Sequence, residues 1–189
     1  RLCVMVALLG AAVPRVADAQ PSAPAPATGS SRSLTPEEFQ AFVTQLSSAS
    51  VDERIAALDA IGARGFRHRR DATPHLRRLL REDPEWRARA SAGRAIGRLS
   101  IRDGVPDLAR ALRDPQVDVR VVAAAALWRL PDPAAVPALV ELLSDSDATA
   151  RQWGALALGV TRDSRATQPL IGLLRDSAED VRLDSVRSL

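Results

Sequence analysis

Residues 115–145, PQVDVRVVAAAALWRLPDPAAVPALVELLSD, decide the fold of this 189-residue chain. Apolar residues in the first half recur at intervals of three and four, at Val119, Val122, Ala123, Ala126 and Leu127. This spacing places them on one face of an α-helix. A second apolar stripe runs from Val136 to Leu143. Asp132-Pro133 separates the two, with Asp as a helix cap and Pro at the first helical position. The stretch therefore predicts two helices joined by a short turn.

The same pattern recurs along the chain. Arginines equivalent to Arg120 are spaced by 31 residues, and one more precedes them by 35; together they form an arginine ladder of Arg54, Arg89, Arg120, Arg151 and Arg182. Each unit ends in an aspartate, at Asp83, Asp114, Asp145 and Asp176. The predicted repeats are 49–83, 84–114, 115–145, 146–176 and a partial repeat, 177–189.

These units predict an all-α fold. One unit cannot bury its apolar face alone, so its neighbours must stack on it. Thr35-Pro36-Glu37-Glu38 matches a capping box and predicts a capping helix at 35–48. We therefore expect residues 35–189 to form an α-solenoid of about four and a half helical hairpins.

The first 19 residues have the features of a signal peptide. Arg1 precedes an apolar run of 12 residues, and Ala17-Asp18-Ala19 fits cleavage before Gln20. A membrane anchor is the first alternative, but a spanning helix needs about 20 apolar residues. A buried core helix is the second.

Residues 20–34 are rich in Pro, Ala and Ser, which is typical of a flexible linker. We expect an exported protein, periplasmic or extracellular, that has no membrane attachment after cleavage. The chain is expected to be truncated at both ends, so the full repeat number and the oligomeric state stay open.

Composition excludes several classes of protein. The 26 basic residues are all Arg, and Lys and Tyr are absent, so a net charge of only +3 gives a pI near 10.6 without implying a nucleic-acid-binding surface. Cys3 is the single cysteine, which excludes a disulfide scaffold. Neither His68 nor His75 is followed by Glu, and no phosphate-binding loop or nucleophile elbow is present. We predict no catalytic residue, cofactor or metal.

The chain resembles HEAT-like repeats of the phycobilisome-lyase type. The matching stretches are 118–127 (DVRVVAAAAL), 130–139 (LPDPAAVPAL), 157–159 (ALG) and 173–176 (LLRD), and the resemblance covers roughly 49–189. It implies the solenoid fold, and it implies that the second helix of each hairpin lines a concave face. It says little about function, because such repeats occur in scaffolds, adaptors and a few enzymes.

Two surfaces are candidates for binding. The arginine ladder is interpreted as structural, each Arg pairing with an acidic loop residue of a neighbouring hairpin; a ligand-binding ladder is the alternative. Outward positions of the second helices form a candidate partner site: Arg78, Arg81, Arg110, Arg113, Glu141 and Arg175. The alternative there is an ordinary solvated face.

Two further features allow a structural or a binding interpretation. The basic loop Phe66-Arg67-His68-Arg69-Arg70 is either solvated or an anion site. Trp86, Trp128 and Trp153 either pack between hairpins or form a stacking platform.

We expect a non-enzymatic scaffold that holds a protein partner, with an acidic segment as the candidate, on its concave face. The alternatives are an enzyme or enzyme-associated subunit, lyase-like or oxidoreductase-associated, and, with less support, nucleic-acid binding by the basic first units.

Overall fold

The computed structural model describes residues 32–189, in which all regular structure is helical, and the predicted α-solenoid is confirmed. The α-helices are α1 (Pro36–Gln45), α2 (Val51–Arg64), α3 (Arg69–Glu82), α4 (Trp86–Arg98), α5 (Val105–Ala111), α6 (Val117–Arg129), α7 (Val136–Leu142), α8 (Ala148–Thr161), α9 (Thr167–Leu173) and α10 (Glu179–Ser188). The signal peptide predicted at 1–19 and most of the linker predicted at 20–34 lie outside the described residues.

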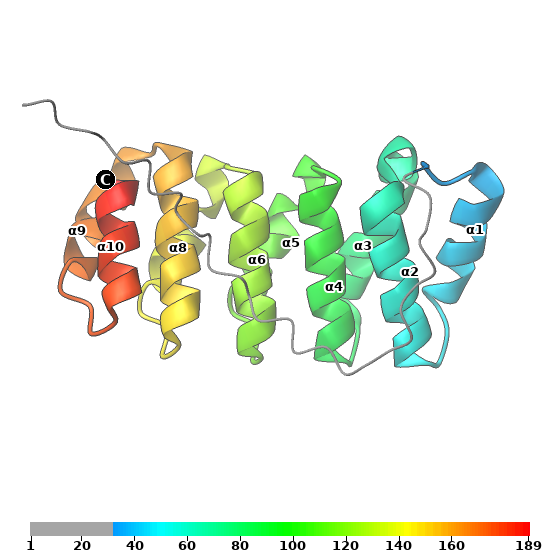
Figure 1. Cartoon of the computed structure of the whole chain (residues 1–189), viewed down its shortest axis with the longest axis horizontal. Coiled ribbons are helices and arrows are strands. Elements are labelled where there is room, and N and C mark those ends of the chain that lie inside the picture. Colours follow the sequence, from blue (N-terminus) through cyan, green and yellow to red (C-terminus); the bar gives the residue numbers. More distant parts are fainter. Residues whose placement is uncertain (1–31) are drawn as a thin grey trace, which may run out of the picture. The chain divides into compact units, whose positions relative to one another are not determined.

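The helices form two rows (Figure 1). The first helices of the hairpins, α2, α4, α6, α8 and α10, lie side by side in front, and the second helices, α3, α5, α7 and α9, lie behind them. Short 3₁₀ turns precede the second helices: η1 (Phe66–His68), η2 (Arg102–Gly104), η3 (Pro133–Ala135) and η4 (Ser164–Ala166). The core lies between the rows and contains fully buried leucines such as Leu76, Leu108, Leu139 and Leu170.

Helix ends follow local capping rules at some places and depart from them at others. Thr35 makes the predicted capping box with Glu38, and Asp132 caps η3. Asp114, in contrast, does not cap α6. The helix begins at Val117 after Gln116, and the Asp114 carboxylate accepts the Gln116 N–H at 2.9 Å. This carboxylate also pairs with an arginine of the preceding hairpin.

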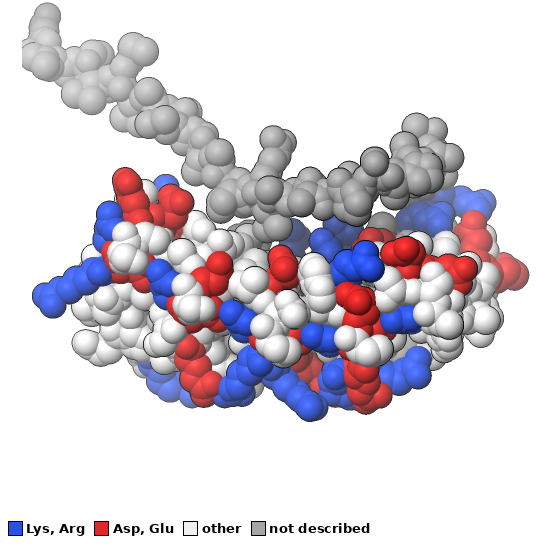
Figure 2. Space-filling model, turned by 90° about the horizontal axis from the view of Figure 1, so that it is seen from below, with Lys and Arg blue, Asp and Glu red and all other residues white. Residues whose placement is uncertain are grey.

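The first helices pack against one another more closely than the second helices do. Small residues allow this approach: a Cβ added at Gly62 would lie 3.1 Å from the Ala95 Cα, and one at Gly97 would lie 3.1 Å from the Ala126 Cα. A stack of hairpins whose first helices are closer together bends toward that row, and the side of the second helices bulges outward (Figure 2). The first helices therefore line the concave face. The prediction that the second helices line the concave face was wrong. The side on which successive hairpins pack more closely becomes concave, and here that is the side of the first helices.

Candidate interaction surfaces

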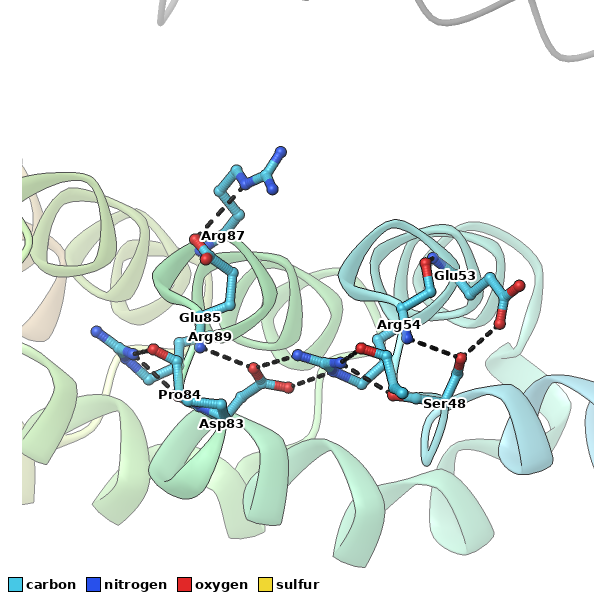
Figure 3. Close-up of polar contacts among 10 residues, drawn as sticks. Ser48, Glu53, Arg54, Asp83, Pro84, Glu85, Arg87 and Arg89 are labelled. Atoms are coloured by element: carbon cyan, nitrogen blue, oxygen red, sulfur yellow. Dashed lines mark hydrogen bonds and ion pairs between the residues drawn. The ribbon is translucent and has the colours of Figure 1, made fainter.

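The first two hairpins show the geometry of the arginine ladder (Figure 3). Arg54 on α2 donates from Nε and a terminal nitrogen to both oxygens of Asp83, each at 2.8 Å. Its other terminal nitrogen donates to the backbone carbonyls of Ser48 and Ala49, at 2.9 and 3.2 Å. The Arg54 and Asp83 side chains are only 11% and 2% exposed. One guanidinium thus ties together the loops before and after its own hairpin.

The next three ladder arginines repeat this arrangement. They pair with an aspartate 25 residues further on, as Arg89–Asp114, Arg120–Asp145 and Arg151–Asp176, at 2.6–2.9 Å. The hydrogen bonds that Arg151 donates lower the pKa of Asp176, and the hydrogen bonds that Arg120 donates to Asp145 raise the pKa of Arg120 further above its usual value. The three acceptor carboxylates belong to the aspartates that end the predicted repeats 84–114, 115–145 and 146–176.

Arg182 follows only half of the pattern. It donates to the carbonyls of Asp176 and Ser177 at 2.8 and 3.1 Å, but within residues 32–189 it makes no ion pair. The first four ladder guanidiniums, by contrast, are occupied by carboxylates and carbonyls of the chain itself. The structural interpretation of the ladder predicts contacts of this kind, and it stays a prediction.

The candidate partner site on the second helices lies on the bulging side of the stack. Several of its charges already have partners: Arg113 holds Glu141 through two hydrogen bonds of 2.7 Å, and Arg81 pairs with Asp107 at 3.2 Å. The remaining cations, Arg78, Arg110 and Arg175, are exposed and make no ion pair within the described residues. Arg81, Arg110 and Arg113 line one shallow depression, together with Asp107 and Asp114. This face therefore combines two neutralised pairs with three exposed arginines that have no ion-pair partner in the described residues.

The concave face offers a different set of side chains, which the sequence analysis missed. Arg94 and Arg98 on α4 and Arg129 on α6 are exposed and make no ion pair in the described part of the chain. They follow their ladder arginines by five or nine residues, so the repeat register contained the signal that would have placed them together.

Next to these arginines the concave side becomes apolar. Trp128 is 41% exposed and Val160 is 37% exposed, while Val122, Ala125 and Leu156 are half-buried. Trp153 is buried and meets Trp128 edge to face, with ring centroids 6.3 Å apart. Trp153 therefore packs between hairpins, whereas Trp128 presents its ring at the surface.

The basic loop makes contacts of its own. The Arg69 guanidinium lies over the Phe66 ring at 4.6 Å, and Phe66 is 54% exposed. His68 stacks on Phe39 at 4.7 Å and lies 3.1 Å from the Leu34 carbonyl. This loop anchors the start of the repeat domain, and its remaining cations face solvent.

Within residues 32–189 no group of three or more His, Cys, Asp or Glu side chains is placed to hold a metal ion. In the same range no helix is both long and apolar enough to span a membrane.

A model of HEAT repeats matches residues 39–118 and 105–189. Among solved structures, the chain is similar to the complex of CpcE and CpcF of phycocyanin lyase from Nostoc sp. PCC7120, with 25% identity, a TM-score of 0.73 and coverage of 89% of this chain and 68% of that chain. It is also similar to a computationally designed armadillo repeat protein for modular peptide recognition, with 20% identity, a TM-score of 0.60 and coverage of 80% of both chains. No curated protein matches the chain in sequence.

Proposed function

The chain belongs to the HEAT-repeat family, and from this premise we propose that it is a non-enzymatic scaffold that holds a protein partner on its concave face. The observation that carries the proposal is the exposed Trp128 ring on the concave face. Both faces keep exposed arginines without an ion-pair partner in the described residues, but the second helices α3, α5, α7 and α9 contain no Trp or Phe. The concave face keeps exposed Trp128 beside arginines that have no carboxylate partner in the described residues. Aromatic and Arg side chains are enriched at protein interfaces.

The scaffold proposal also rests on rigidity. Paired guanidiniums fix successive hairpins relative to one another, so the concave surface is preorganised. A preorganised surface loses less conformational entropy when it binds a partner.

Site-specific cross-linking in the cells that make the protein tests this proposal. A photo-reactive residue would replace Ala125 on the concave face or, as the matched control, Arg110 on the opposite face. We expect one discrete protein adduct from position 125 and none from position 110. Equal adducts from both positions, or adducts from 110 alone, would overturn the concave-face proposal.

We also propose that the protein is exported, on the basis of the apolar run and the Ala17-Asp18-Ala19 pattern. The test is N-terminal sequencing of the protein recovered outside the cytoplasm. Export predicts a mature chain that starts at Gln20, and Ala19→Arg should block this processing. An unprocessed chain in the cytoplasm would contradict export.

A second candidate function is that of an enzyme-associated subunit. The similarity to the CpcE–CpcF complex of phycocyanin lyase favours it. A bound pigment or a stoichiometric metal in the purified protein would support this alternative, with absorbance spectroscopy and metal analysis as the measurements.

A further inference from the structure

Trp128 occupies a position that is glycine in the other complete repeats, Gly62, Gly97 and Gly159. At Gly97 the neighbouring helices α4 and α6 pack closely. A Cβ added to Gly97 would lie only 3.0 Å from the Ala126 Cβ. An indole has no room in such a contact. Its ring instead reaches the surface of the first-helix side, where it is 41% exposed and is supported edge-on by the buried Trp153 ring. The packing therefore fixes an aromatic surface in one place on the array.

Two arginines lie next to this aromatic surface in one row. Arg98 and Arg129 each follow their ladder arginine by nine residues, on the neighbouring helices α4 and α6. The Arg129 stem crosses toward α4, since its Cδ lies 3.8 Å from the position of a Cβ on Gly97. Arg94 lies one helical turn before Arg98, and none of the three makes an ion pair within residues 32–189. Positive charge is therefore concentrated beside Trp128.

Helix electrostatics account for only part of this arrangement. Arg98 and Arg129 lie in the last turns of α4 and α6, where a cation interacts favourably with the helix dipole. That effect does not require Arg94, which lies a turn earlier, nor does it require an exposed tryptophan. A ligand that is both anionic and apolar fits all four side chains.

Building on the proposed function, we propose that the concave surface of α4, α6 and α8 binds an extended segment of a protein partner that carries two carboxylates and one aromatic or large aliphatic residue. The carboxylates pair with Arg98 and Arg129, and the apolar side chain packs on Trp128. Guanidinium groups bind carboxylates in bidentate geometry.

Helix spacing sets the register of this segment. Packed helices lie about 8–10 Å apart. A segment in the polyproline II conformation advances about 3.1 Å per residue and returns its side chains to the same face at every third residue. The two carboxylates are therefore about three residues apart. The apolar residue follows about three residues later, toward α8, where exposed Val160 extends the apolar surface.

The probe is a labelled synthetic peptide, Glu-Ser-Gly-Glu-Ser-Gly-Phe, followed by fluorescence anisotropy with the full chain. Its control is the same composition with adjacent glutamates, Glu-Glu-Ser-Gly-Ser-Gly-Phe. We expect saturable binding of the first peptide and at least about tenfold weaker binding of the second, since a charge-assisted hydrogen bond contributes enough for about a tenfold change.

Variants locate the site. Arg98→Gln and Arg129→Gln should each weaken binding about tenfold, whereas Arg110→Gln, an exposed arginine on the opposite face, should leave it unchanged. Trp128→Gly, which restores the residue of the other complete repeats, should abolish the binding contribution of phenylalanine. Thermal melting checks that each variant folds, and the two surface arginine variants keep the test valid if Trp128→Gly does not.

The outcomes separate this inference from the scaffold proposal. Three results would overturn the proposal of a bound segment with two carboxylates and one apolar residue. They are absence of peptide binding, equal binding of both peptides, or a loss of affinity with Arg110→Gln equal to that with the Arg98 and Arg129 variants. If cross-links still form from position 125, the scaffold proposal stands without it. If neither peptide binding nor cross-linking from position 125 is observed, both the segment proposal and the scaffold proposal are overturned.

Discussion

At the scale of single residues, Arg120 shows why arginine occupies the ladder. One edge of its guanidinium binds both oxygens of Asp145, and the remaining nitrogen donates to the carbonyls of Asp114 and Pro115 at 2.9 and 3.3 Å. A lysine ammonium has three donors but no planar fork, so it cannot reproduce this bidentate contact together with both carbonyl contacts. The geometry accounts for an arginine at this position in each of the four complete repeats.

The lowered pKa of Asp176 predicts a pH-dependent contribution to stability. Hydrogen bonds from Arg151 are the main cause of the lowering. The contribution is therefore complete above the ordinary carboxyl value of about 3.9 and is lost as the pH falls through the lowered value. Asp176→Asn should reduce the free energy of unfolding at pH 7 by about 2–4 kcal/mol, and by progressively less in acid.

Urea unfolding of the wild type and Asp176→Asn over a series of pH values is the measurement. Asp118→Asn is the control, because Asp118 is exposed and makes no ion pair in the described residues. Wild-type and Asp176→Asn curves that run parallel at all pH values would show that this ion pair does not carry the acid sensitivity.

At the scale of helices, small residues control how closely the first helices pack. Gly97→Ala places a methyl group 3.1 Å from the Ala126 Cα, a backbone atom that moves only if α6 moves. Overpacking costs about 1–3 kcal/mol, which outweighs the gain of about 1 kcal/mol in helix propensity. We expect Gly97→Ala to lower the free energy of unfolding by about 1 kcal/mol.

Gly172→Ala is the matched comparison within α9. An added Cβ there meets nothing within 4 Å, so this variant should be neutral or more stable by up to about 1 kcal/mol. Denaturant midpoints measure both. Equal stabilisation by the two substitutions would mean that α4 and α6 separate freely and that close packing does not set the bend.

The helices themselves were predictable from the sequence because their apolar spacing is local. The role of Asp114 was predictable only in part, because an acidic loop partner was expected for each ladder arginine but a separate start of α6 was not. Asp-Pro satisfies the rules for a helix start, yet its carboxylate is held by Arg89, 25 residues earlier, and α6 begins two residues after Pro115. The concave face was missed for a related reason: it depends on contacts between hairpins, such as Gly97 against Ala126. Periodicity within one hairpin contains no information about that distance.

At the scale of the whole molecule, each hairpin contacts its immediate neighbours. Stability is then approximately a sum of repeat terms and nearest-neighbour terms. Asp114 links two successive ladder members, because its carboxylate accepts from Arg89 and its carbonyl accepts from Arg120. Neighbouring members of the ladder are therefore coupled, whereas members two repeats apart share no residue.

Double-mutant cycles measure this coupling. Arg89→Gln combined with Arg120→Gln should deviate from additivity by about 0.5–3 kcal/mol. Arg54→Gln combined with Arg120→Gln should be additive within about 0.5 kcal/mol. The free energies come from urea unfolding of single and double variants. A large deviation from additivity for Arg54 and Arg120 would show that ladder arginines two repeats apart are energetically coupled.

Ser48 occupies the place that an aspartate holds in the later loops: its hydroxyl accepts the Ser50 N–H at 3.1 Å, as the Asp83 carboxylate accepts the Glu85 N–H at 3.0 Å. A hydroxyl requires no cation opposite it, so the ladder can start here without leaving a charge unpaired. The first loop of the ladder therefore differs from the later loops in carrying no carboxylate at this place. In a duplicated copy of residues 115–145 inserted after Asp145, the new arginine would donate to the Asp145 carbonyl at one junction. The carbonyl of the new final aspartate would accept from Arg151 at the other junction, as the Asp145 carbonyl does now. Length can thus change by whole units in the interior, while insertion ahead of Ser48 would first require a new carboxylate there.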